Sequence, residues 1–202
     1  MAERLTTEDD VRISYAMQGA GPGILMVHML NSNKDAWAPL AQALNSQGFA
    51  TMAIDLRGHG DSELSWTTFA AQDFKNMALD LESAAKFMKK QGTPIAGIVG
   101  ASLGANHALC FAAKKRPGLK SVVVLSPGLD YRGVKIAQAI SAIDVPLFIV
   151  SAKGDMYSAQ SSEQLHKTHG TLHMVEGDAH GTRMLDTTLI DNITSWIAQQ
   201  HK

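Results

Sequence analysis

Short runs of apolar, strand-forming residues alternate along this chain with stretches whose apolar residues recur at helical spacing. The apolar runs are nearly continuous, which predicts strands that are buried on both faces of a sheet. Such strands, alternating with amphipathic helices, are typical of a mostly parallel sheet covered by helices on both sides, so an α/β fold is predicted. The expected strands are residues 23–28, 49–55, 94–99, 119–125, 146–150 and 171–175, and the expected helices are residues 35–47, 74–88, 102–115 and 185–197.

The N-terminal residues depart from this alternation. Two short strands are expected there, one near Leu5 and one at residues 11–16, and they are predicted to form an antiparallel edge of the sheet. No internal repeat, charge run or low-complexity stretch divides the rest of the sequence. Residues 1–202 are therefore predicted to form one domain, which is an ordinary size for an α/β protein.

Composition excludes several classes of function. The chain has 18 Lys and Arg against 19 Asp and Glu, a net charge of −1, so it lacks the basic surface expected of a nucleic-acid-binding protein. Its apolar stretches are far shorter than the roughly 20 residues that span a bilayer. The single cysteine, Cys110, excludes an internal disulfide framework. Residues 1–10 lack an apolar signal region, so a cytoplasmic location is expected; an exported form without its signal peptide would look the same, and oligomeric state stays open.

Residues 100–104 have the sequence Gly-Ala-Ser-Leu-Gly, between an expected strand and an expected helix. A sharp strand-to-helix turn of this kind holds its serine in a strained conformation and lifts the hydroxyl above the sheet. The two arms of the turn pass closely, so they require very small residues, and Gly100 and Gly104 meet that requirement. A glycine-packed turn with no catalytic role is the alternative interpretation. The strand before the motif and the helix after it favour a nucleophile at Ser102.

A catalytic serine needs a base, and the base needs a carboxylate that orients it. In a sheet of this kind both should follow later strands, with the acid before the histidine. Asp155 lies in a Gly-Asp loop after residues 146–150, and His180 lies in a loop after residues 171–175. Because ligands and catalytic groups gather at the carboxyl ends of parallel strands, Ser102, Asp155 and His180 are predicted to form a catalytic triad.

Other titratable residues offer alternatives. Asp130 follows the preceding strand and is the better substitute for the acid, whereas Asp178 shares one tight loop with His180. The remaining histidines are predicted to be structural: His28 in a loop-stabilising hydrogen bond, His59 bracing a turn, His107 facing the interior, and His166, His169 and His173 in a solvated cluster. That cluster has no companion carboxylate at ligand spacing, so no metal site is expected there.

Taken together, these segments resemble the α/β-hydrolase superfamily, the group of serine esterases and lipases. The matching residues are 27–30, 55–62, 100–104, 154–155 and 178–181, and the resemblance extends from about Leu5 to the final helix. It implies that Ser102 is the nucleophile, Asp155 the acid and His180 the base, and that the backbone N–H groups of Leu103 and Leu30 form the oxyanion hole. Met29 departs from the family pattern, which has glycine there, and is expected to narrow the acyl pocket or alter the oxyanion loop.

The segment after residues 119–125 indicates how open the site is. Val145 follows Ser126 by only 19 positions, and larger relatives insert a helical cap here. A loop and one short helix, residues 134–143, are expected here, leaving an open site with little or no cap. Met29, Met156 and Tyr157 are predicted to line a shallow acyl groove. Further apolar residues near the same loops are Leu30, Leu103, Tyr131 and Met184, although methionines and aromatic residues also fill cores.

The sequence thus predicts a serine hydrolase, carboxylesterase-like, that cleaves esters of small or short-chain acyl groups through an acyl-enzyme on Ser102. Its partner would be a small-molecule ester, and no metal or organic cofactor is needed for this chemistry. A thioesterase or an amidase would use the same triad. A non-catalytic, ligand-binding member of the fold is a further alternative, against which the presence of all three triad positions argues.

Overall fold

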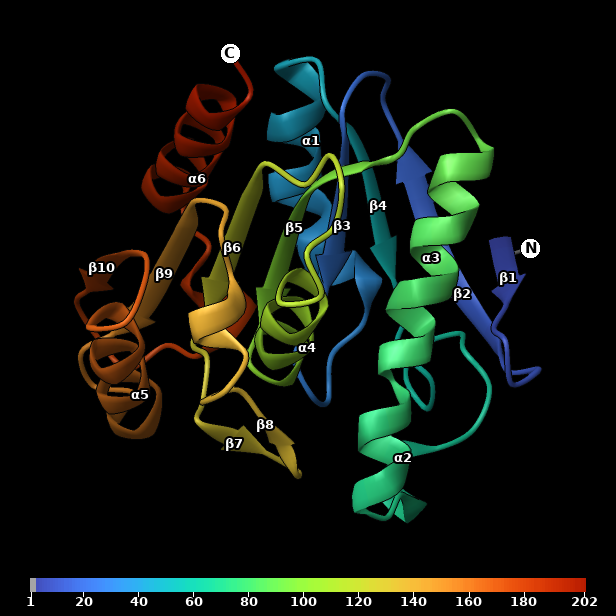
Figure 1. The fold of residues 1–202 in the computed structure, drawn as a ribbon, viewed down its shortest axis with the longest axis horizontal. Coiled ribbons are helices and arrows are strands. Elements are labelled where there is room, and N and C mark those ends of the chain that lie inside the picture. The colour runs from blue at the N-terminus through green and yellow to red at the C-terminus, as the bar shows by residue number, and fades with distance from the viewer. Residues whose placement is uncertain (1–2) are drawn as a thin grey trace.

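The computed structural model describes residues 3–202 and shows an eight-stranded sheet in the order β1-β2-β4-β3-β5-β6-β9-β10 (Figure 1). The strands from β4 to β10 along this order are parallel, while β1 and β2 form an antiparallel edge, as predicted. The bounds are β1 Glu3–Thr6, β2 Arg12–Gln18, β3 Gly23–Val27, β4 Ala50–Ile54, β5 Ile95–Ala101, β6 Ser121–Leu125, β9 Leu147–Ala152 and β10 Thr171–Val175. Every residue of β3, β4, β6 and β9 is buried, which confirms the apolar runs as two-faced strands.

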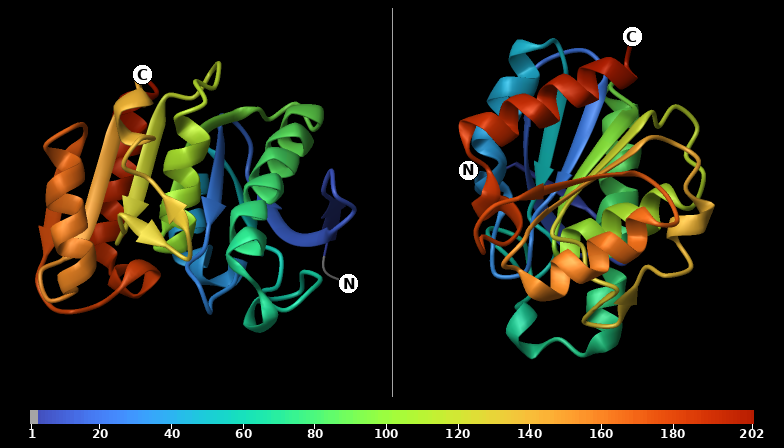
Figure 2. Two further views of the ribbon diagram at one scale, coloured as in Figure 1. Left: turned by 60° about the horizontal axis from the view of Figure 1, so that its bottom comes forward. Right: turned by 90° about the vertical axis from the view of Figure 1, so that its left-hand side faces the viewer.

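Helices cover both faces of the sheet (Figures 1 and 2). On one face α1 packs beside α6, and on the other lie α3, α4 and α5. The bounds are α1 Ala38–Ser46, α2 Ala71–Asn76, α3 Ala78–Lys90, α4 Leu103–Ala112, α5 Met156–His166 and α6 Thr187–Gln200. Each layer has its own core: Leu44 and Ile193 belong to the core on the α1 and α6 face, and Leu81 and Leu109 to the opposite core. The architecture is therefore the α/β fold that the alternation predicts.

Two predicted helices are divided in the structure. Residues 35–47 form a 3₁₀ turn, Lys34–Trp37, followed by α1, whose first turn contains Pro39. The helix predicted over residues 74–88 consists of α2 and α3, which meet at the buried Met77. Neither division moves the sheet, because the apolar residues on both sides of each break still face it.

The segment between β6 and β9 corrects a prediction. A helix was expected at residues 134–143, but the structure has a hairpin of β7, Asp130–Tyr131, and β8, Val134–Lys135, followed by a 3₁₀ turn at Ile140–Ala142. The turn of the hairpin has positive φ angles at Arg132, 53°, and Gly133, 85°, and the Asp130 carboxylate accepts a hydrogen bond from the Gly133 amide at 2.8 Å. A turn with positive φ at its central residues joins antiparallel strands and cannot continue as a helix.

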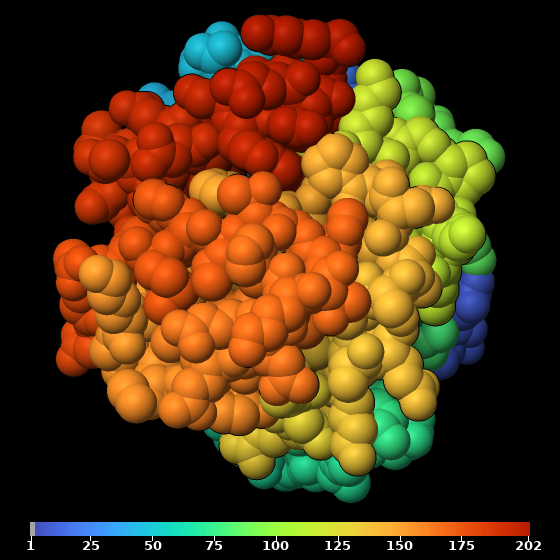
Figure 3. Space-filling model, turned by 60° about the vertical axis from the view of Figure 1, so that its left-hand side comes forward, coloured from blue at the N-terminus to red at the C-terminus, as the bar shows by residue number. Residues whose placement is uncertain are grey.

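This segment lies beside α5, and both reach the surface on the face shown in Figure 3. The Tyr157 hydroxyl fastens the two together, since it accepts from the Asp130 amide and donates to the Asp130 carbonyl, both at 3.0 Å. No helix among residues 3–202 is long and apolar enough to cross a membrane.

Candidate functional site

Ser102 lies between the end of β5 and the start of α4, in a conformation that few L-residues adopt. Its φ is 52° and its ψ is −118°, and the residue as a whole is only 5% exposed. The turn depends on two glycines. A Cβ on Gly100 would lie 2.4 Å from the Gly104 carbonyl oxygen, and one on Gly104 would lie 2.3 Å from the Val27 carbonyl oxygen. The strained backbone conformation of Ser102 is thus held in place by the close packing of the backbone around the turn.

Asp155 and His180 contact each other directly. The Asp155 Oδ2 and His180 Nδ1 atoms are 2.6 Å apart, and both side chains are partly exposed, at 16% and 33%. With the carboxylate accepting from Nδ1, the other ring nitrogen, Nε2, is left as the acceptor of the neutral imidazole. No hydrogen bond joins Ser102 to His180 among residues 3–202, and in unliganded enzymes such bonds are often long.

The hydrogen bond and ion pair of His180 go to Asp155 and to neither alternative acid. Asp130 lies in β7 and is exposed. Its carboxylate accepts a hydrogen bond from the Gly133 amide and lies 4.0 Å from the Lys135 ammonium. Asp178 is exposed and stands in the histidine loop, where its Cβ would lie 3.1 Å from a Cβ on Gly154. The acid that the structure brings to the histidine is the one expected from the loop after β9.

Ser126 is hydrogen-bonded to the loop that carries His180, and the sequence did not predict this contact. Its hydroxyl accepts a hydrogen bond from the Gly181 amide at 3.0 Å, and its own amide donates to the Val150 carbonyl at 2.8 Å. Ser126 is fully buried and has a positive φ of 50°. The only signal in the sequence was its place directly after a predicted strand, because the contact with Gly181 spans 55 residues.

The two candidate oxyanion donors are backbone amides at the ends of β3 and β5. Leu103 begins α4, where amides have no partner within the helix, and Leu30 follows β3 by three residues. Among residues 3–202 neither amide donates a hydrogen bond. The helix N-terminus adds a positive partial charge beside Ser102.

His28 fixes the loop that carries Leu30. The Leu56 amide donates to His28 Nε2 at 3.0 Å, so Nδ1 carries the proton and donates to the Met29 carbonyl at 2.7 Å. Burial lowers the pKa of His28 to about 4, which keeps the ring neutral and this tautomer in place. The predicted loop-stabilising hydrogen bond is therefore present.

Met29 differs from the expectation that it lines the acyl groove. Its side chain is only 8% exposed and belongs to the core on the α1 and α6 face. The Met29 sulfur would lie 2.8 Å from a Cβ on Gly181, and the Thr182 hydroxyl points at it from 3.9 Å. Met29 thus packs beneath the histidine loop. A methionine fits at this position because glycine at 181, with a φ of 59°, leaves the space for it.

Met156 and Tyr157 lie at the surface, directly after Asp155. They are 64% and 46% exposed, and with Leu64 they are the large apolar side chains that residues 3–202 leave exposed. Tyr131 approaches them from β7: its ring centre lies 5.5 Å from that of Tyr157 and 6.3 Å from that of His180, in edge-on contacts. An apolar rim therefore flanks the Asp155–His180 pair.

The other histidines have structural contacts. His59 pairs with the Arg57 carbonyl at 3.1 Å and stacks on Trp66, and His107 is 2% exposed inside α4, as predicted. His166 is exposed and pairs with the Gly170 carbonyl, and His169 is partly buried and pairs with the Val145 carbonyl. No group of three or more His, Cys, Asp or Glu residues within 3–202 is arranged to hold a metal ion.

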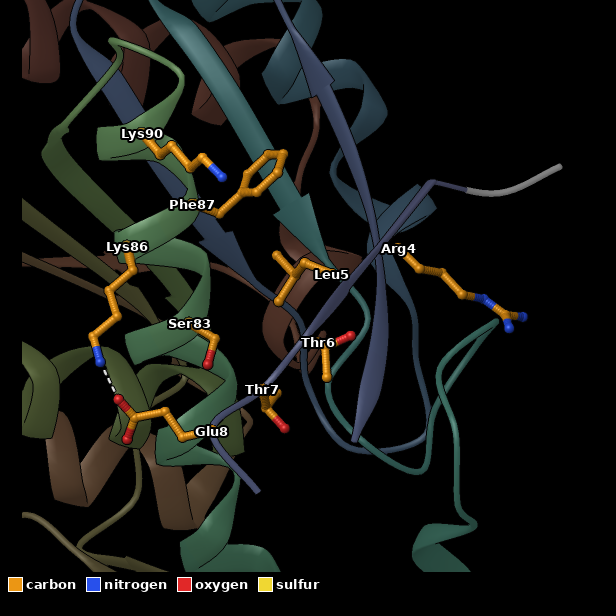
Figure 4. A pocket seen from close by; sticks show the side chains of 9 residues that line it. All are labelled: Arg4, Leu5, Thr6, Thr7, Glu8, Ser83, Lys86, Phe87 and Lys90. Atoms are coloured by element: carbon orange, nitrogen blue, oxygen red, sulfur yellow. Dashed lines mark hydrogen bonds and ion pairs between the residues drawn. The ribbon is translucent and has the colours of Figure 1, made fainter. Parts of the chain in front are cut away.

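A separate hollow of about 380 Å³ lies at the β1 edge of the sheet, between β1 and α3 (Figure 4). Leu5 and Phe87 point toward each other across it, and Lys86 pairs with Glu8 at one end. Its lining comes from residues 4–8 and 83–90, so it contains none of the residues at the carboxyl ends of the parallel strands.

Comparisons with known proteins agree with this architecture. A family model described as serine aminopeptidase, S33, matches residues 22–142, more than half of the chain. A 2-(acetamidomethylene)succinate hydrolase from Mesorhizobium japonicum is 31% identical over 134 residues, which cover 66% of this chain and 44% of that protein. The chain thus spans less than half the length of the curated relatives it matches.

Solved structures resemble the chain over its whole length. An esterase from Thermogutta terrifontis matches with a TM-score of 0.79 and 14% identity over 100% of both chains. An esterase from Exiguobacterium antarcticum matches with a TM-score of 0.78 and 13% identity over 98% of this chain and 99% of that one. At these identities the likeness shows the fold alone.

The order of the sheet, with helices on both faces and a serine at the strand-to-helix elbow, is that of the α/β-hydrolase class of folds. Within that class the chain belongs to the family described as serine aminopeptidase, S33.

Proposed function

We propose that the enzyme cleaves carboxylic esters through an acyl-enzyme on Ser102. The observation that carries the proposal is the 2.6 Å contact between Asp155 and His180, at the same end of the sheet as the strained Ser102. A strained serine, an oriented imidazole and two free amides are the parts that acyl transfer requires.

In the first half of the reaction, the Ser102 oxygen bonds to the ester carbonyl carbon while its proton passes to His180 Nε2. The amides of Leu103 and Leu30 hold the negative oxygen of the tetrahedral intermediate. The bond from carbon to the alcohol oxygen then breaks, and His180 returns the proton to the leaving alcohol. Asp155 holds the imidazole and stabilises its cation throughout.

In the second half, His180 removes a proton from a water molecule, which attacks the acyl carbon. The tetrahedral intermediate collapses, Ser102 recovers its proton from His180, and the carboxylic acid leaves. Apart from the ester and the water, this chemistry requires only side chains and backbone amides of the chain.

The substrate class follows from the surroundings of the site. The hairpin between β6 and β9 is short, and the apolar side chains exposed beside Asp155 are those of Met156 and Tyr157. These two side chains offer apolar surface for the first carbons of an acyl chain and nothing that encloses a long one. We therefore propose small or short-chain acyl esters as substrates, with Met156 and Tyr157 as binding residues.

Amide cleavage is a second candidate, favoured by the family description of a serine aminopeptidase. The test is an alkyl fluorophosphonate, which forms a phosphorus–oxygen bond to an activated serine and expels fluoride. Mass spectrometry should place the adduct on Ser102, and the enzyme should hydrolyse 4-nitrophenyl acetate faster than amino-acid 4-nitroanilides. An unlabelled Ser102 would contradict the proposed nucleophile, and faster cleavage of the anilides would favour the peptidase.

A further inference from the structure

Tyr131 is the residue that the hairpin between β6 and β9 places against the candidate triad. Its ring stands edge-on to the His180 imidazole, with an interplanar angle of 86°. The ring is closely packed, since a Cβ on Gly128 would lie 2.6 Å from the Tyr131 Cε2 atom. The side chain therefore has one position beside the histidine, set by the backbone of the hairpin.

The Tyr131 hydroxyl bonds to groups from two other parts of the fold. It pairs with the Ser158 hydroxyl of α5 at 3.0 Å and donates to the Ser126 carbonyl at 3.4 Å. Ser158 and Ser126 are both fully buried. Burial raises the pKa of Tyr131, while the neighbouring hydroxyls of Ser158 and Ser102 lower it, so the phenol keeps its proton as a hydrogen-bond donor at neutral pH.

Ser126 connects Tyr131 to the histidine loop. Its carbonyl accepts from the Tyr131 hydroxyl, while its own hydroxyl accepts from the Gly181 amide, next to His180. Tyr131 is thus connected to the histidine in two ways. Its ring packs edge-on against the imidazole, and its hydroxyl is linked through Ser126 to the loop that carries His180.

We propose that Tyr131 is a positioning residue for ester cleavage, holding the His180 imidazole in place for its reaction with Ser102. The inference rests on the proposed function. Among residues 3–202 no hydrogen bond joins Ser102 to His180, so the position of the imidazole depends on its other neighbours, the Asp155 carboxylate and the Tyr131 ring. A misplacement of reacting groups by a fraction of an ångström slows catalysis while leaving substrate binding intact.

The test compares Tyr131→Phe with Ser161→Ala. Ser161, also of α5, accepts from the Leu129 amide at 3.3 Å and donates to the Tyr157 carbonyl at 2.7 Å. Its replacement removes a hydroxyl that ties the same segment to the same helix, without any contact to His180. Loosening of the hairpin alone would therefore affect both variants equally.

For Tyr131→Phe, kcat for 4-nitrophenyl acetate should fall about 10-fold with KM unchanged, and the rate constant of fluorophosphonate inactivation should fall by about the same factor, as for the loss of one hydrogen bond of about 1.4 kcal/mol. Ser161→Ala should keep both rates within about twofold of wild type. Because Phe retains the packed ring, Tyr131→Phe should fold, which a thermal unfolding curve checks.

Tyr131→Leu, which removes the ring as well, should be slower than Tyr131→Phe. Wild-type rates in Tyr131→Phe would overturn the inference, as would equal losses in Tyr131→Phe and Ser161→Ala. Wild-type protein that neither reacts with fluorophosphonate nor cleaves the ester would overturn the proposed function instead, so the two failures are distinct.

Discussion

Asp155 and His180 meet because they follow two residues that are partners across the sheet. Ala152, the last residue of β9, pairs in register with Val175, the last residue of β10. Short loops then carry the chain from each of these to Asp155 and to His180, whose Oδ2 and Nδ1 atoms are 2.6 Å apart. The Gly154 amide donates to the Gly177 carbonyl at 2.7 Å, which joins the two loops directly.

Substitutions of the three candidate triad residues should stop turnover without unfolding the enzyme. Ser102→Ala should abolish hydrolysis of 4-nitrophenyl acetate, and His180→Ala should be nearly as severe, because these groups act as a unit. Asp155→Asn should reduce kcat by about 10⁴-fold, the loss known for an amide in place of the acid of a triad. Steady-state kinetics on the three variants measures this, and a larger loss in Asp130→Asn than in Asp155→Asn would reverse the assignment of the acid.

Replacement of Gly104 by alanine should disrupt the elbow. The new Cβ would lie 2.3 Å from the Val27 carbonyl oxygen and 2.4 Å from that of His28, backbone atoms that cannot rotate away. The free energy of unfolding should fall by about 3 kcal/mol, and activity should be lost with it, since these carbonyls belong to the loop that leads to Leu30. Urea unfolding measures the change.

Gly92→Ala is the matched control for that substitution. A Cβ there meets nothing within 4 Å, and its φ of 78° costs only the strain of a left-handed residue, about 1 kcal/mol. This variant should keep wild-type activity. A stable, active Gly104→Ala would show that the arms of the elbow can separate.

Acid should destabilise the fold through its buried histidines. Burial lowers the pKa of His28 and of His107 to about 4, whereas an unfolded histidine titrates near 6.5. Between these values the unfolded chain binds protons that the folded chain does not, so stability is full above about pH 6.5 and declines as the pH falls toward 4. The slope should be about 1.4 kcal/mol per pH unit for each histidine.

His107→Leu isolates one of these contributions. His107 Nε2 has no hydrogen-bond partner among residues 3–202, so leucine removes the titration and leaves no second polar group unpaired on that side. Urea unfolding from pH 7 to pH 4.5 should show a slope smaller by about one proton than in wild type. An unchanged slope in His107→Leu would mean that His107 is protonated in the folded protein.

Acyl-chain preference should follow the exposed apolar surface beside Asp155. Each methylene that Met156 or Tyr157 covers contributes about 0.8 kcal/mol, so kcat/KM should rise from acetyl to about butyryl or hexanoyl esters and then level. A series of 4-nitrophenyl esters below their micelle concentrations tests this. Met156→Ser should lower the butyryl-to-acetyl ratio of kcat/KM by about fourfold. A steady rise to long chains in wild type would contradict an open site.

The sheet and the positions of the loops that carry Ser102, Asp155 and His180 could be predicted because their signals are local. Buried parallel strands are short apolar runs, and the elbow at Ser102 needs its two glycines within five consecutive residues. The hairpin between β6 and β9 could not be predicted, because strands of two residues, such as Val134–Lys135, are too short to show an alternation of apolar and polar residues. Their pairing depends on Asn106, whose amide donates to the carbonyls of Gly128 and Val134 from another element.

The direction of Met29 and the contacts of Ser126 depend on residues far along the chain. Met29 packs inward because Gly181, which is 152 residues later, has no side chain to compete for the space. Ser126 bonds to the amide of that same glycine. A single sequence presents each of these residues with its neighbours in the chain, whereas their positions are decided by how the loops after β3, β6 and β10 come together.

The hairpin begins after β6 and ends before β9, two strands that are hydrogen-bonded neighbours in the sheet. A segment between adjacent parallel strands can change its length without altering the register of either strand, so Ser102 and Asp155 would keep their places if residues 127–144 were exchanged. This makes the hairpin a natural graft point for changing the substrate range of the enzyme. Any graft must also return a phenol to the space above Ser158, or the new specificity will come with a slower enzyme.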